Sequence, residues 1–104
     1  MIEPDIFRAL ADPTRRAVFE RLAGSEMSVS ELTSNFAVSQ PAISQHLAAL
    51  KAAGLVSERR QGRFAYYSAA PEGLQPLTEW IDRYRSFWPG RIEKLKTVLK
   101  GMEP

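Results

Sequence analysis

Residues 28–54 read SVSELTSNFAVSQPAISQHLAALKAAG, a pattern that predicts two short helices in close succession. Ser28 and Glu31 form a capping box at the first helix start, and Ser39 is the expected cap of the second, with a proline tolerated in its first turn. Gly54 is the expected end of the second helix. Two helices separated by about three residues are typical of a helix-turn-helix, although other helical hairpins share that spacing.

A β-hairpin is expected directly after the second helix. Two stretches that favour strands, the second of them rich in aromatic residues, flank Gln61 and Gly62, and a glycine turn between two such stretches predicts a hairpin. A hairpin in this position is the wing of a winged helix-turn-helix. Before the motif, Asp12 and Pro13 are expected to begin a helix that ends at Gly24.

The predicted fold class is therefore mostly α with a short β-hairpin (α+β), a winged helix-turn-helix in a single domain over residues 1–104. The helix-turn-helix covers about 28–54 and the wing about 55–70. Helices expected to join two copies cover about 4–11 and 72–100. A chain of this length has a modest core, so burying apolar surface between two copies would add stability.

The helix expected from Gln40 to Ala53 turns its large aliphatic side chains to one side and small polar side chains to the other. Glutamine can pair with adenine through two hydrogen bonds in the major groove, and serine can bond a base edge or a phosphate. An ordinary solvated helix face is the alternative interpretation. The candidate DNA-binding residues on this helix are Ser39, Gln40, Pro41, Ala42, Ser44, Gln45 and His46.

His46 is the only histidine of the chain. It is either a phosphate contact, helped by partial protonation, or a packing residue between the two helices of the motif.

The wing carries Arg59, Arg60 and Arg63 around Gly62. Their guanidinium groups are expected to lie along phosphates or in the minor groove, and the alternative is a charged sheet edge that prevents aggregation.

The last predicted helix is rich in aromatic side chains at spacings of three and four, a pattern interrupted at Pro89-Gly90. Such a face is expected to form a hydrophobic core shared by two subunits, and the alternative is a pocket for an apolar effector. The candidate dimer-interface residues are Ile6, Phe7, Leu10, Leu77, Trp80, Ile81, Tyr84, Trp88 and Leu95.

The composition limits the classes of function that remain. There is no cysteine, which excludes disulfides and thiolate metal sites, and a single histidine cannot build a histidine-rich metal site. Ser44 and His46 are two residues apart on one helix and do not face each other, and no phosphate-binding glycine loop is present, so no enzyme is expected. Neither a secretory signal nor a membrane span is expected, which favours a cytoplasmic protein. No cofactor and no metal are expected.

Charge is placed unevenly along the chain. The net charge is +2, and residues 1–54 carry five Lys and Arg against six Asp and Glu, whereas residues 55–104 carry nine against six. A basic second half is compatible with a polyanionic partner, but so small an excess is weak support by itself.

Four segments together resemble the ArsR-type winged-helix repressors over nearly the whole chain. They are LADPTRR at 10–16, VSQPAISQHL at 38–47, LKAAGLV at 50–56 and RQGR at 60–63. The resemblance implies a homodimer joined by its first and last helices, with the helix from Gln40 in the major groove of double-stranded DNA and the hairpin at the adjacent groove. It also implies repression at an inverted-repeat operator in front of the protein's own or a neighbouring operon.

The chain departs from the metal-sensing members of that family. Those members carry a Cys-x-Cys pair in the first helix of the motif, where residues 31–36 here hold no thiol. Others bind metal through histidine and acidic residues of the last helix, which here has Glu79, Asp82 and Glu93 but no histidine. The chain therefore resembles the metal-independent, autorepressor-like branch. A winged-helix module for protein interaction is the alternative function, and the effector is unknown.

Overall fold

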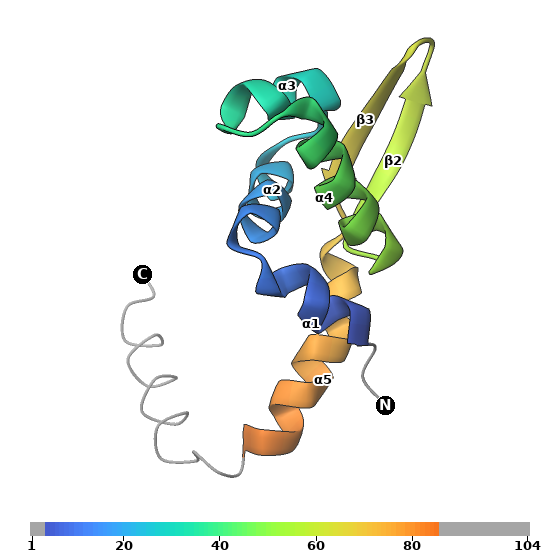
Figure 1. The fold of residues 1–104 in the computed structure, drawn as a ribbon. Helices are drawn as coiled ribbons and strands as arrows, with labels where there is room; N and C mark the ends of the chain where they lie inside the picture. The colour runs from blue at the N-terminus through green and yellow to red at the C-terminus, as the bar shows by residue number, and fades with distance from the viewer. Residues whose placement is uncertain (1–3, 86–104) are drawn as a thin grey trace, which may run out of the picture.

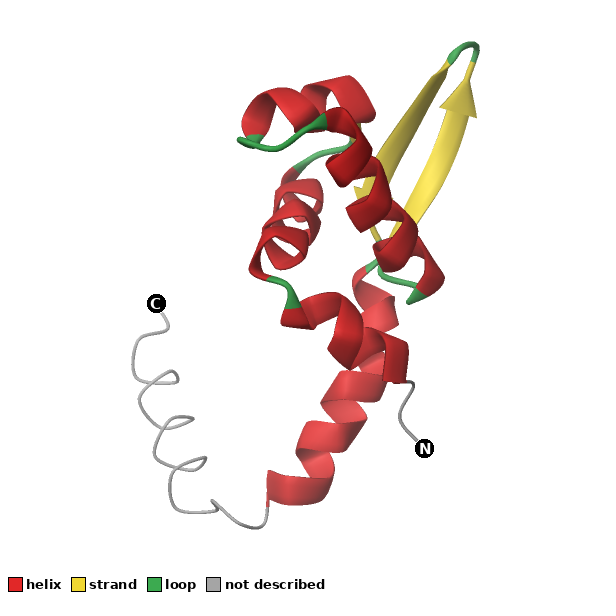
Figure 2. Cartoon of the chain, in the orientation of Figure 1, coloured by secondary structure: helices red, strands yellow, loops and turns green. Residues whose placement is uncertain are grey.

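The computed structural model describes residues 4–85 of the chain. The helices are α1 (Pro4–Ala11), α2 (Pro13–Gly24), α3 (Val29–Asn35), α4 (Gln40–Ala52), the 3₁₀ helix η1 (Pro71–Leu74) and α5 (Gln75–Tyr84). The strands are β1 (Met27–Ser28), β2 (Val56–Gln61) and β3 (Phe64–Ala69). Figure 1 shows α3, α4 and the β2–β3 hairpin at one end of the molecule and α1 with α5 at the other. The predicted fold class, mostly α with a hairpin, is confirmed (Figure 2).

Side-chain caps begin three of the helices, as the sequence predicts. The Asp12 carboxylate accepts a hydrogen bond from the Arg15 amide at 3.0 Å, which also lowers the pKa of Asp12. At α3, Ser28 Oγ accepts from the Glu31 amide at 3.2 Å while the Glu31 carboxylate accepts from the Ser28 amide at 2.9 Å. Ser39 Oγ accepts from the Ala42 amide at 3.3 Å. Each cap satisfies an amide that the first helical turn leaves without a partner.

The sheet has one strand more than the sequence indicates. Its order is β1-β3-β2, all antiparallel, because Met27 and Ser28 pair with Tyr67 and Tyr66 of the hairpin. The expected two-stranded wing is thus part of a three-stranded sheet. Two residues are too few to show an alternating pattern, so only the pairing with β3 reveals β1.

The core fills the space between α2, α3, α4 and the start of β2. The buried hydrophobic side chains are Ile6, Ala9, Val18, Leu22, Leu32, Ile43, Leu47, Leu50, Leu55 and Val56. Three of these belong to α4, which confirms the inward face expected for that helix. The orientation of α4 is therefore fixed by apolar burial, and its opposite face stays in water.

Two glycines allow the chain to turn from α4 into the sheet and back to η1. Gly54 has a φ of +76°, a conformation that favours glycine. Gly73 lies against it, since a Cβ at Gly73 would be 2.0 Å from the Gly54 carbonyl oxygen. This close approach holds the start of the last helical segment against the end of α4.

The last helix is observed only in part. The described portion begins as a 3₁₀ turn at Pro71 and ends as α-helix at Tyr84, so the expected stretch to residue 100 lies largely outside the described residues. Trp88, Leu95 and Pro89-Gly90 lie there as well. Within residues 4–85, every helix is too short or too polar to span a membrane.

Candidate nucleic-acid interface

The outer face of α4 carries the small polar side chains that the sequence singled out. Gln40, Pro41, Ser44 and Gln45 are all exposed, as is Ser39 at the helix cap, and Ala42 is half-buried. Residues 44 and 45 stand one turn into the helix, and Ala48 leaves open space one turn further on. The helix thus presents hydrogen-bonding groups without a long charged side chain among them.

The β2–β3 hairpin carries the arginines, and the three differ in their surroundings. Arg59 is held by the Glu26 carboxylate at 3.1 and 2.7 Å, and its guanidinium lies 4.9 Å from the ring centre of Tyr66. Arg60 lies 3.4 Å from the Glu58 carboxylate. Arg63 is exposed beside Gly62, with no ion pair among the described residues. Of the three wing arginines, Arg63 therefore has the guanidinium with the fewest contacts to the rest of the described chain.

A second ion pair ties the wing to α4. Lys51 Nζ lies 2.7 Å from the Glu58 carboxylate, whose side chain is only 13% exposed. This contact lowers the pKa of Glu58 and raises that of Lys51. Glu58 therefore forms ion pairs with two cationic side chains, Lys51 of α4 and Arg60 of the wing. Through these pairs it couples the position of the hairpin to that of the helix.

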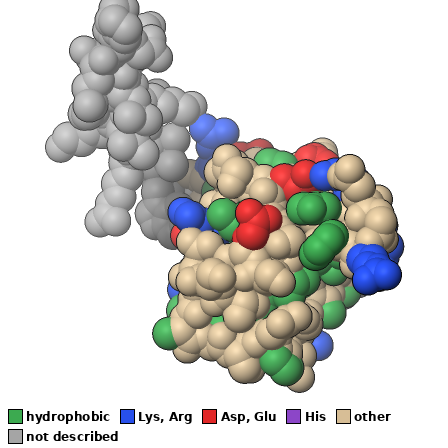
Figure 3. All heavy atoms as spheres, turned by 90° about the horizontal axis from the view of Figure 1, so that it is seen from above, with side chains coloured by type: hydrophobic (Ala, Val, Ile, Leu, Met, Phe, Trp, Pro, Cys, Tyr) green, Lys and Arg blue, Asp and Glu red, His purple; other side chains and the backbone are tan. Residues whose placement is uncertain are grey.

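The start of α4 and the tip of the wing meet in one groove. It has a volume of about 250 Å³, and its lining joins Gln40 at the start of α4, Arg63 and Phe64 at the tip of the hairpin, and the first residues of α3. Seen from this end of the molecule, the surface is mostly backbone and uncharged polar atoms, with Lys and Arg in patches at its edges (Figure 3). The start of α4 and the tip of the hairpin thus open toward the same side.

His46 lies beside α2. It is half-buried, and its Nδ1 accepts a hydrogen bond from Arg15 Nε at 3.4 Å. This geometry supports the packing interpretation over a free phosphate contact. The partner helix differs from the expected one, because the contact joins α4 to α2 and does not join the two helices of the motif.

An exposed aromatic face covers the opposite end of the molecule. Phe7 of α1 meets Trp80 of α5 edge-to-face, with ring centres 5.5 Å apart, and Trp80 lies 5.0 Å from Tyr84. These rings and Ile81 are each about 40% exposed or more. Leu10 and Leu77 are half-buried, whereas Ile6 is only 2% exposed because it packs inside its own chain. The expected dimer contact therefore depends on the exposed rings and not on Ile6.

Known proteins share both the sequence and this architecture. Residues 12–58 match the family model described as "Bacterial regulatory protein, arsR family". The transcriptional repressor SdpR of Bacillus subtilis is 39% identical, over 74% of this chain and 86% of its own length. The HTH-type transcriptional regulator Rv2034 of Mycobacterium tuberculosis is 47% identical, over 75% of this chain and 73% of its own. An ArsR-like transcriptional regulator from Rhodococcus sp. RHA1 superposes with a TM-score of 0.75 at 33% identity, covering 95% and 91% of the two chains.

The chain belongs to the ArsR family. It is accordingly a DNA-binding transcriptional regulator of the repressor type, and its relatives are not enzymes. The family resemblance and the winged-helix fold drawn from the sequence are both confirmed.

ArsR-family metal sensors would require a cluster of ligands, and residues 4–85 hold no group of three or more His, Cys, Asp or Glu able to bind an ion. Glu79 and Asp82 are exposed on α5, and Glu93 lies outside the described residues. The expectation of a metal-independent member stays a prediction.

Three residues of this ArsR-family domain were missed by sequence reasoning. Glu26 holds a wing arginine, Glu58 joins the wing to α4, and Phe64 lies 59% exposed in the groove. An aromatic side chain at a hairpin turn is a weak signal that could have identified Phe64. Glu26 pairs with a residue 33 positions away, and no local pattern indicates such a pair.

Proposed function

We propose that the protein is a homodimeric repressor that binds an inverted-repeat operator in double-stranded DNA and controls its own or a neighbouring operon without sensing metal. One observation carries the proposal. Gln40 at the start of α4 and Arg63 of the wing line the same groove, so the beginning of this helix and a cationic hairpin open together toward one partner. Because its target is chromosomal DNA, the protein is expected to act in the cytoplasm.

The two surfaces divide the work of DNA recognition. Ser44 and Gln45 lie one turn into α4 and select bases in the major groove, where glutamine pairs with adenine. Gln40, exposed at the start of α4, contacts phosphate through its side-chain amide. Arg63 and Arg60 anchor the hairpin to the adjacent backbone or minor groove, and these contacts supply affinity without sequence information.

The dimer forms through the aromatic face, with Phe7 and Trp80 at its centre. Rings that are partly exposed in a single chain lose that contact with water when two copies meet. A twofold axis through this face directs both α4 helices toward the same duplex. Half-sites are then expected about one helical turn apart, roughly 34–36 Å.

Fluorescence anisotropy with the DNA upstream of the gene tests this function. The protein is expected to bind that duplex at least 1000-fold more tightly than a random duplex, a ratio of the order found for specific binders. Added EDTA or Zn²⁺ is expected to leave the affinity unchanged, because no thiol and only one imidazole are present. Equal affinity for both duplexes at low salt, with the dimer intact, would contradict operator binding and favour a protein-interaction module.

A further inference from the structure

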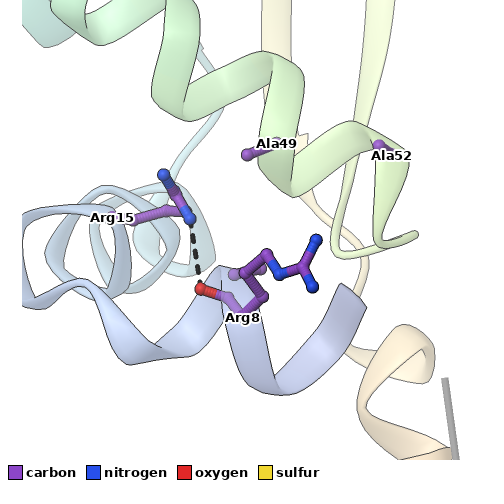
Figure 4. Close-up of a pocket in the computed structure, with 5 residues that line it drawn as sticks. Arg8, Arg15, Ala49 and Ala52 are labelled. Atoms are coloured by element: carbon purple, nitrogen blue, oxygen red, sulfur yellow. Dashed lines mark hydrogen bonds between the residues drawn. The ribbon is translucent and has the colours of Figure 1, made fainter. Parts of the chain in front are cut away.

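A small pocket on the flank of α4 lies outside the groove described above. Its volume is about 130 Å³, and it is lined by Arg8 and Ala9 of α1, Arg15 of α2, and Ala49 and Ala52 of α4. Figure 4 shows the guanidinium groups of Arg8 and Arg15 in the space between α1 and α4, with the alanine side chains of α4 facing them. Three helices thus enclose a space that is cationic on one side and apolar on the other.

One of the two arginines of this pocket, Arg15, is held by neutral groups. Arg15 Nη1 donates to the Arg8 carbonyl oxygen at 3.2 Å, and its Nε donates to His46 at 3.4 Å. Among the side chains that the structure describes, those of residues 6–85, neither Arg8 nor Arg15 has an ion pair partner. The nearby Asp12 carboxylate is engaged by the Arg15 backbone amide at the α2 cap and does not line the pocket. Within the lining that the structure describes, two positive charges therefore share one space and no carboxylate lies among them.

We propose that this pocket binds a small oxyanion, a phosphate or carboxylate group, between Arg8 and Arg15. A guanidinium offers paired N–H donors whose geometry matches such oxygens, and charge-assisted hydrogen bonds are the stronger kind. Ala49 and Ala52 keep the space open, because larger side chains at these positions would fill it. The volume suits one such group with little else attached.

The pocket adjoins both working surfaces of the repressor. Arg8 follows Phe7 of the aromatic face, and Ala49 stands one helical turn after Gln45 of the reading face. Arg15 also contacts His46 directly, so an oxyanion that draws its guanidinium away alters a contact between α2 and α4. A bound ligand changes DNA affinity only if it favours one arrangement of these helices. This regulatory step rests on the proposed function, whereas binding of the anion does not.

Titration of the full chain with inorganic phosphate, without DNA and at constant ionic strength kept with KCl, tests the binding step. In two-dimensional NMR, saturable shifts are expected at Arg8, Arg15, Ala49 and Ala52. Arg8→Ala is expected to weaken binding about tenfold, a change of about 1.4 kcal/mol. The matched control is Arg21→Ala, which removes an exposed arginine of α2 that bonds only Asn35 and is expected to bind phosphate as the unaltered chain does.

A second variant separates the contribution of the open space in the pocket from the contribution of its two positive charges. Ala52→Leu keeps both arginines but fills the space from an exposed position, so the chain is expected to fold and phosphate binding to be lost. The absence of saturable shifts, or equal affinity in Arg8→Ala, Ala52→Leu and the unaltered chain, would overturn the proposal. Thermal melting of each variant confirms that the fold is retained.

Operator titrations distinguish the two sources of the oxyanion. If the source is a free solute, phosphate changes the operator affinity of the unaltered chain but not of Arg8→Ala, and the two affinities agree without phosphate. If it is a DNA phosphate, Arg8→Ala weakens operator binding about tenfold even without phosphate. Failure of all operator binding would contradict the proposed function, while the phosphate titration would still decide the pocket.

Discussion

The two ends of this molecule meet their partners with different chemistry. At the end formed by α4 and the wing, serine, glutamine and arginine side chains are exposed, and Phe64 is the one large apolar side chain exposed among them. At the end formed by α1 and α5, three aromatic rings lie exposed in contact with one another, among charged side chains. Polar groups suit a hydrated, charged partner, whereas rings gain most from complete removal from water. This difference is the one expected if, as proposed, one end reads DNA and the other end joins subunits.

The ends also differ in how firmly their groups are held before a partner binds. Glu58 links α4 to the hairpin through its ion pairs with Lys51 and Arg60. Glu26, directly before β1, holds Arg59 of the hairpin. At the other end, Phe7 and Trp80 contact each other within one chain. Charged groups that are already oriented lose less conformational entropy on binding than free side chains.

The largest expected effect is at the aromatic end. Trp80→Ala removes a large ring near the centre of the proposed dimer contact and is expected to weaken dimerisation by at least about 2 kcal/mol, the cost typical of an interface hot spot. Sedimentation equilibrium measures this change, and operator affinity is expected to fall with it. Glu79→Gln, an exposed change about 100° round α5 from Trp80, is the control. If the dimer dissociation constant of Trp80→Ala equals that of the unaltered chain, the aromatic face is not the dimer contact.

The next effect is expected on α4. Gln45→Ala is expected to lose about 1–3 kcal/mol of discrimination at one base pair, because a bidentate contact with a base is removed. Anisotropy competition with operators mutated one position at a time measures it, and Gln75→Ala on α5 is the control. Equal losses on operator and random duplexes would show that Gln45 does not read a base.

A smaller and less specific effect is expected on the wing. Arg63→Ala is expected to weaken binding to every duplex and to reduce the slope of log K against log salt by about 0.9, the value for one phosphate contact. Arg60→Ala is expected to do less, since Arg60 already lies beside Glu58. Arg83→Ala on α5 is the control. A change confined to the operator would assign Arg63 to base reading.

The smallest effect is expected at the exposed Glu26–Arg59 pair. The hydrogen bond from Arg59 lowers the pKa of Glu26 below its ordinary value of 4.5. A lowered pKa means that the carboxylate stabilises the folded chain at neutral pH and that this contribution is lost as the pH falls through the lowered value. The melting temperature of Glu26→Gln is therefore expected to lie slightly below that of the unaltered chain at pH 7 and to match it in acid. A difference that persists in acid would mean that the pair is not the cause.

Local sequence patterns were reliable wherever the interaction spans a few residues. Asp12, Ser28 and Ser39 each cap a helix through an amide three residues along the chain, and all three caps are present. The spacing of Ile43, Leu47 and Leu50 predicted the buried side of α4, and hence its exposed polar face. Short-range hydrogen bonds and helical periodicity depend only on neighbours, so the sequence is sufficient to read them.

The sequence by itself determined the order of the helices, the glycine turn of the hairpin and the polar character of α4. Only the tertiary structure decided that Met27 and Ser28 form a strand, that His46 contacts Arg15 at a separation of 31 residues, and that Ile6 is enclosed within its own chain. It also brought Gly73 against Gly54 and enclosed the pocket between α1, α2 and α4. These contacts join segments distant in the chain, and their partners are selected by the packing of the whole core, which no local pattern encodes.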